Sequence, residues 1–215
     1  MKSFLVSLRI RILAFIVSLF SVCSVLNAQE DVTLKELSEK MSSSCVELSY
    51  KYTFRKSGIN MNGDGHLVAQ GLFWRLSGNG IEMYCDSKSV WVIDPSLKEV
   101  VIEPVVSDSV QEYDVNPAML LLRLDEMFRL RDSVTSKDGK TVTYILDPVV
   151  SGKIEYLNVM VLKSDSTISQ ATIALKDGDL IKIEVSSMKL TPRITDEAFR
   201  PQRTFDSTWI VTDLR

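Results

Sequence analysis

The sequence has little that would support catalysis or nucleic-acid binding. It contains one histidine, His66, so neither a serine–histidine–aspartate arrangement nor a histidine-based metal site can draw on a second one. It has no nucleophile elbow and no glycine-rich phosphate loop. The 25 lysines and arginines are balanced by 28 acidic residues and form no basic stripe of the kind that nucleic acid requires. We therefore expect no enzymatic activity, no cofactor and no nucleic-acid partner.

Only one short segment imitates a metal-binding motif. Asn60-Met61-Asn62-Gly63-Asp64-Gly65 is similar to the opening of a calcium loop, but its twelfth position is Gly71, where a bidentate glutamate belongs. We interpret Asn62–Gly65 as a turn between two strands and expect no bound metal.

Long apolar runs are absent except for one near the N-terminus. It extends from Ile12 to about Leu26, after a basic start and before the first acidic residue, Glu30. A membrane-spanning helix needs about 20 apolar residues, so the run is short for a span and typical of a secretory signal peptide. We predict a signal peptide over residues 1–28, cleaved near Ala28, and export to the periplasm. A retained N-terminal anchor and a lipid-modified Cys23 are the alternatives.

Residues 29–215 have the length of a single domain. Cysteine is scarce in this part, with only Cys45 and Cys85. In an oxidising compartment the two thiols can form one disulfide, or both can stay free and buried. The sequence leaves this choice open.

The apolar pattern indicates a few helices and many strands. A period typical of a helix runs from Val32 to Ser43, and further helical segments are predicted after Asn116-Pro117, continuing through Phe128, and at 195–199. Elsewhere short alternating runs are separated by turn residues, which indicates an antiparallel meander that is curled or partly closed. Some strands are apolar on both faces, so something must cover the second face. The helices either complete an ordinary core or form a lid over a hollow.

Four segments stand in order along the chain: Gly71-Leu72-Phe73-Trp74, Asp86 to Pro95, Asn116 to Leu121, and Ile210–Arg215. They resemble motifs of the LolA family of outer-membrane lipoprotein carriers. The first is similar to a family strand written G-x-[LF]-W, the second to the hairpin DGK-[ST]-x-W-x-Y-x-P, and the third to the helix P-x-x-LL. The last is similar to the ending of a subgroup of these carriers. The resemblance extends over about residues 32–215.

The resemblance implies a mainly β, α+β fold: a curved antiparallel sheet forming a half-open β-barrel, with a few short helices as a lid. It implies a periplasmic chaperone that binds the acyl chains of lipoproteins, receives them from an inner-membrane lipoprotein-releasing transporter and passes them to an outer-membrane acceptor. There are departures, because Ser87 and Ile93 replace the family glycine and tyrosine. Ser77 stands where the family has a lid-latching arginine, and we expect Arg75 to have the wrong alternation to replace it.

The acyl-binding surface that we predict is apolar and rich in methionine, since flexible thioether side chains adapt to varied ligands. Its candidate residues are Phe73, Trp74, Ile81, Met83, Trp91, Val101, Met119, Leu120, Leu122 and Met160. We expect the protein to be a monomer. The alternative function is a periplasmic sensor or scaffold of the same fold that binds a protein partner or another lipid.

Overall fold

The structure is a computed structural model that describes residues 34–56, 59–105 and 124–215. All of these belong to one unit, Val32–Arg215. The signal peptide predicted for residues 1–28 lies outside the described residues and stays a prediction. Among the described helices, none is both long enough and apolar enough to cross a bilayer.

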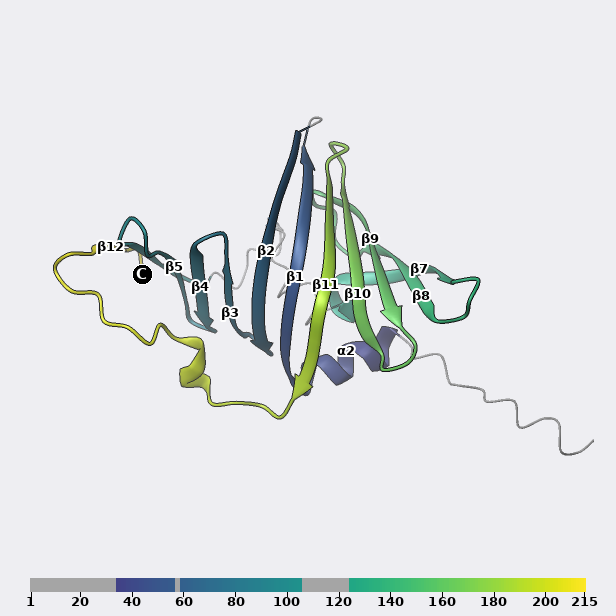
Figure 1. The fold of residues 1–215 in the computed structure, drawn as a ribbon, viewed down its shortest axis with the longest axis horizontal. Helices are drawn as coiled ribbons and strands as arrows, with labels where there is room; N and C mark the ends of the chain where they lie inside the picture. The colour runs from purple at the N-terminus through teal and green to yellow at the C-terminus, as the bar shows by residue number, and fades with distance from the viewer. Residues whose placement is uncertain (1–33, 57–58, 106–123) are drawn as a thin grey trace, which may run out of the picture. The chain divides into compact units, whose positions relative to one another are not determined.

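A single open, curved sheet of twelve strands dominates the fold (Figure 1). The strands are β1 (Cys45–Lys56), β2 (Ile59–Gln70), β3 (Phe73–Gly78), β4 (Ile81–Asp86), β5 (Ser89–Asp94), β6 (Glu99–Pro104), β7 (Phe128–Thr135), β8 (Thr141–Pro148), β9 (Ile154–Leu162), β10 (Thr167–Leu175), β11 (Leu180–Thr191) and β12 (Ile210–Asp213). Their order across the sheet is β12-β6-β5-β4-β3-β2-β1-β11-β10-β9-β8-β7. All neighbours pair antiparallel except β12, which runs parallel to β6. The predicted half-open, mainly antiparallel barrel is confirmed.

Tight turns lie where the sequence predicts most of them. Asn79 and Gly80 form a two-residue turn between β3 and β4, and both have positive φ, 51° and 79°. Asparagine and glycine tolerate this left-handed conformation, and such a turn matches the twist of the two strands.

The turn predicted at Asn62–Gly65 is wrong, because β2 runs through it without a break. Gly63 pairs with Tyr52 of β1, and Gly65 pairs with Tyr50. The tyrosine rings cover the glycines so closely that a Cβ atom at Gly65 would lie 2.4 Å from a Tyr50 ring carbon. Aromatic rings that pack over strand glycines in this way stabilise pairing that glycine alone disfavours.

The helix predicted to continue through Phe128 is also wrong at its end. Helix α4 spans Leu124–Met127, and Phe128 is the first residue of β7. The residues that follow pair with β8, so sheet pairing overrides the local helical pattern. The start of the predicted segment, after Asn116-Pro117, lies outside the described residues.

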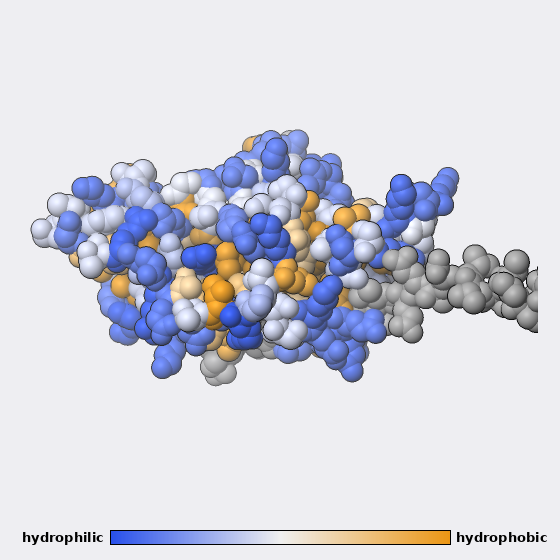
Figure 2. Space-filling view, turned by 60° about the horizontal axis from the view of Figure 1, so that its bottom comes forward, coloured by the Kyte–Doolittle hydropathy of each residue, from blue (hydrophilic) through white to orange (hydrophobic). Residues whose placement is uncertain are grey.

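Two helices lie on one face of the sheet, which we call the inner face. Helix α2 (Leu34–Ser42) confirms the first predicted helix, and its buried residues Leu37 and Met41 pack into the main apolar core. Ser38 Oγ donates a hydrogen bond of 2.5 Å to Asp125 of α4, which links the two helices. Seen from the bottom of Figure 1, where α2 lies, apolar residues gather at the centre between hydrophilic margins (Figure 2).

The segment after β11 crosses the opposite, outer face of β3–β6. A short 3₁₀ helix, η1 (Asp196–Phe199), confirms the third predicted helical piece and buries Phe199 completely, in a cluster with Cys45 and Val68. Farther along, Phe205 and Trp209 pack on a second outer-face cluster, before the chain adds β12 to the edge of β6. We call β3–β6 the wing of the sheet. The C-terminal segment therefore covers the outer face of the wing.

A glycine sets the close approach of β2 and β3, which gives a first prediction. A Cβ atom at Gly78 would lie 2.3 Å from the carbonyl oxygen of Asp64. The change Gly78→Ala should therefore force the strands apart and lower the free energy of unfolding by about 1–3 kcal/mol. Urea denaturation measures this. Gly139→Asn is the control, because no described residue other than its chain neighbours has an atom within 4 Å of its Cβ position, and asparagine accepts its φ of 71°. Equal stability of Gly78→Ala and the parent protein would contradict the close approach.

Candidate functional site

An unbroken row of apolar side chains crosses the inner face from β11 to β6. The paired positions, in order across the strands, are Met188, Leu48, Leu67, Leu76, Met83, Val92 and Val101. A half-buried sheet with one wet face would place polar residues on it. Along this row the inner face is instead apolar over seven neighbouring strands.

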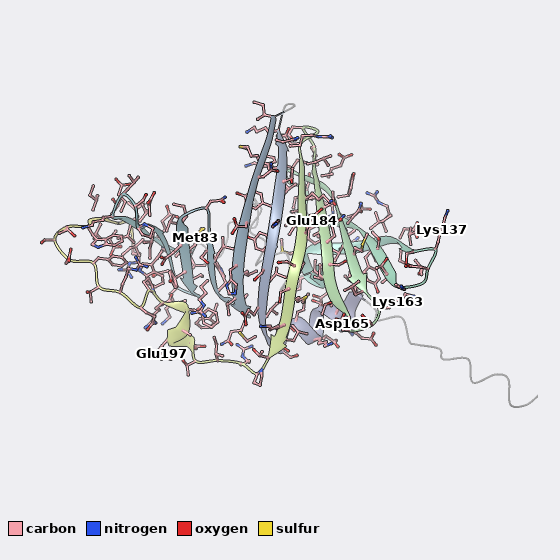
Figure 3. The ribbon with its side chains drawn as sticks, viewed as in Figure 1. Met83, Lys137, Lys163, Asp165, Glu184 and Glu197 are labelled. Carbon is pink, nitrogen blue, oxygen red and sulfur yellow. The ribbon has the colours of Figure 1, made fainter. Side chains whose placement is uncertain are left out.

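The row is fully buried at one end and only partly covered at the other. Leu48 and Leu67 are 2% and 0% exposed, whereas Leu76, Met83 and Val101 are half-buried. Helix α2 packs beside β1, and Met83 lies well away from it in the wing formed by β3–β6 (Figure 3). The wing thus presents an apolar inner surface that the described helices do not fill.

Burial on the inner face also shifts the pKa values of two side chains. Desolvation raises the pKa of Tyr50 to about 12, and burial likewise raises the pKa of the Cys85 thiol. Both shifts have the sign expected when the charged form loses water in apolar surroundings. The face therefore disfavours charge at these two positions.

The sheet brings some of the predicted site residues together and separates others. Trp74, Ile81, Met83 and Val101 share the inner face. On the outer face, Phe73 contacts the Phe199 ring at a centroid distance of 5.9 Å, Trp91 packs with the C-terminal segment, and Met160 pairs with Thr143 and Gln170. Met119, Leu120 and Leu122 lie outside the described residues. Acyl binding by any of these residues stays a prediction.

The candidate residues predicted from the sequence do not include several inner-face residues that strand alternation indicates. Leu76 lies two positions after Trp74 and so shares its face, and Val90 pairs with Cys85 on the same side. Tyr52 packs against the same core. Counting by two from a single inner residue on each strand would have found them.

The expectation about Arg75 needs correction. Arg75 and Ser77 are two residues apart and lie on the same, outer face, paired with Val68 and His66 of β2. Alternation therefore does not distinguish them. Neither side chain faces α2 or α4, which pack on the inner face.

The two cysteines among the described residues are free and buried, and they belong to different faces. Cys45 packs with Phe199 on the outer side, and Cys85 packs with the inner core. No disulfide forms between them.

An ion pair fixes the C-terminal segment to the outer face and gives a pH-dependent prediction. Asp86 is 6% exposed and accepts hydrogen bonds from the Ser89 and Lys88 amides and, at 2.8 Å, from Arg200. Burial raises its pKa, but these bonds outweigh burial and hold the pKa below its ordinary value. The resulting stability is complete above about pH 4 and is lost as pH falls through the lowered pKa.

The change Asp86→Asn should therefore cost about 1–3 kcal/mol of unfolding free energy at pH 7. The cost should shrink as pH falls below the ordinary range of a carboxyl group. Urea denaturation of both proteins at a series of pH values measures the difference. A difference that is the same at every pH would contradict this assignment.

This geometry defines a class of protein: an open β-sheet with an apolar, partly covered inner face and helices on that face. The family profile described as "Outer membrane lipoprotein carrier protein LolA" matches residues 77–202. The chain belongs to the LolA family. This confirms the family resemblance of the motifs.

A solved structure shows the same fold. An uncharacterised conserved protein from Thermus thermophilus superposes with a TM-score of 0.53 at 14% identity, over 84% of this chain and 96% of that chain. Two others superpose less closely. A LolA superfamily protein from Nitrosomonas europaea gives 0.43 at 13% identity, over 79% and 98%. A putative outer-membrane lipoprotein-sorting protein domain from Vibrio parahaemolyticus gives 0.41 at 8%, over 77% and 94%. A search of the curated proteins finds no match.

Proposed function

We propose that the protein is a periplasmic chaperone that carries the acyl chains of lipoproteins from the inner to the outer membrane. The observation that carries the proposal is the apolar row on the inner face, which remains half-exposed at Leu76, Met83 and Val101. Membership of the LolA family supports the same reading.

The apolar character and partial cover of the row fit the physical demands on such a carrier. Each acyl methylene that leaves water contributes about 0.8 kcal/mol, so a sixteen-carbon chain gains roughly 12 kcal/mol when fully sheltered. A carrier must also release its cargo, so a surface that shelters the chain only in part is suited to transfer. Met83 and the partly buried Met188 supply flexible contacts along this row.

The proposal includes a route. The N-terminal segment 1–28 would direct export and be removed near Ala28, leaving residues 29–215 as the mature carrier. A lipoprotein-releasing transporter in the inner membrane would load the inner face, and an acceptor in the outer membrane would unload it. The carrier would act as a monomer, without a cofactor and without catalysis.

The experiment is purification of the mature protein from the periplasm of its host, followed by lipid extraction and mass spectrometry. We expect bound lipoprotein or acyl chains in amounts that approach one cargo molecule per protein. A matched preparation of a variant with a carboxylate on the inner face, Met83→Glu, should contain far less. Lipid-free protein recovered from cells that actively export lipoproteins would count decisively against carriage.

A further inference from the structure

A polar groove lies on the outer face, on the other side of the sheet from the apolar row. It consists of two adjoining hollows of about 370 and 570 Å³, which share His66 and Ser77. The smaller is lined by Arg75, Glu82, Tyr84 and, from the C-terminal segment, Arg203. Both volumes lie in the range of small-molecule sites.

The carboxylates beside the smaller hollow are already engaged by other side chains. Arg203 Nη2 donates to both oxygens of Glu82 at 2.7 and 2.8 Å, and the Tyr84 hydroxyl donates to the same carboxylate at 3.2 Å. Glu47, beside the groove, lies 3.2 Å from the His66 ring.

In the smaller hollow, Arg75 is the guanidinium that the Glu82 carboxylate does not pair with. Its side chain is half-buried in the groove, yet it forms no ion pair or hydrogen bond with any residue that the structure describes. The lining of the smaller hollow holds two guanidinium groups and one carboxylate, and Arg203 is the one that pairs with this carboxylate. A planar guanidinium with free N–H donors favours a bidentate carboxylate or phosphate.

We propose that this groove binds a small polar molecule through an oxyanion, a carboxylate or a phosphate, held by the Arg75 guanidinium beside the Ser77 hydroxyl. The rest of such a ligand would lie in the larger hollow. Its side chains are polar and include Ser49, Lys51, Asp64, Asn79 and Ser186. The site faces away from the acyl-binding surface, so it is independent of the proposed carrier function.

The test is an NMR titration of the ¹⁵N-labelled mature protein with inorganic phosphate and, separately, with acetate, at constant ionic strength. We expect saturable shifts of the amides around Arg75 and Ser77, with a dissociation constant on the order of 1 mM for such simple probes. In Arg75→Gln the affinity should fall at least about tenfold, because the paired charge is lost.

Arg129→Gln is the matched control, since Arg129 is an exposed arginine on β7, at the far edge of the sheet. Its affinity should equal that of the parent protein. Shifts that persist unchanged in Arg75→Gln overturn the site, and so do shifts that do not saturate when vesicle binding is also independent of Arg75. Sedimentation with phosphatidylglycerol vesicles separates the two sources of phosphate. Arg75-dependent vesicle binding without saturable binding of free phosphate assigns the oxyanion to a lipid headgroup.

Discussion

Replacing Met83 by glutamate should abolish binding of acyl chains and leave the protein folded. Met83 lies in the middle of the inner-face row, between Leu76 of β3 and Val92 of β5. A carboxylate there must either lose water when an acyl chain covers it or prevent the chain from binding, and an unpaired charge in apolar surroundings costs several kcal/mol. We expect the affinity for a fluorescent sixteen-carbon fatty acid to fall on the order of a hundredfold or more.

The controls separate loss of binding from loss of fold. Because Met83 is half-buried and not in a closed core, the variant should keep its circular dichroism spectrum. Met83→Leu conserves apolar volume and should bind nearly as well as the parent. Thr143→Glu places the same charge on the outer face, opposite Met160, and should leave acyl binding unchanged. If Met83→Glu binds as tightly as Thr143→Glu, the inner face of β4 is not part of the acyl site.

Truncation of Phe199 should give the largest loss of stability among the substitutions considered, about 3–5 kcal/mol. Its ring, which belongs to the C-terminal segment, is fully buried against Phe73, Val68 and Cys45 on the outer face of the sheet. Phe199→Ala leaves a cavity in a small cluster with few other side chains to close it. Because η1 fixes the start of the segment, we also expect Trp209, farther along, to become more exposed to solvent.

Urea denaturation measures the loss, and quenching of tryptophan fluorescence by iodide reports the release of the segment. Leu214→Ala, just after β12, is the control, because Leu214 is 58% exposed and its truncation should change stability by no more than about 0.5 kcal/mol. Comparable effects of the two substitutions would show that Phe199 does not fasten the segment to the sheet.

The correct and the incorrect sequence predictions have separate physical causes. Alternation and turn residues are local, so the curved meander, helix α2 and the turn at Asn79-Gly80 were predictable. A turn was wrongly predicted at Gly63 and Gly65, because their strand conformation depends on tyrosine rings contributed by β1. Met127 and Phe128 form the boundary of α4 because β8 pairs with the residues that follow.

The candidate site divides in the same way. The sequence predicted an apolar, methionine-containing surface and marked Trp74, Ile81, Met83 and Val101, which share the inner face. It also marked Phe73 and Trp91, which lie on the other face under the C-terminal segment. Both groups look alike in the sequence, because an aromatic residue needs burial on either face. Whether a face of the sheet is covered, and by which segment, depends on contacts between residues far apart in the chain.

By itself, then, the sequence determined the strand-rich class, the family and the apolar character of the surface, since each follows from residue types at short spacing. The tertiary structure alone decided which face the described residues leave partly uncovered, because α2 and α4 pack on one side and residues 192–209 on the other. It also decided that Arg75, His66 and Arg203 line a common groove, since strand register and a long return of the chain bring them together.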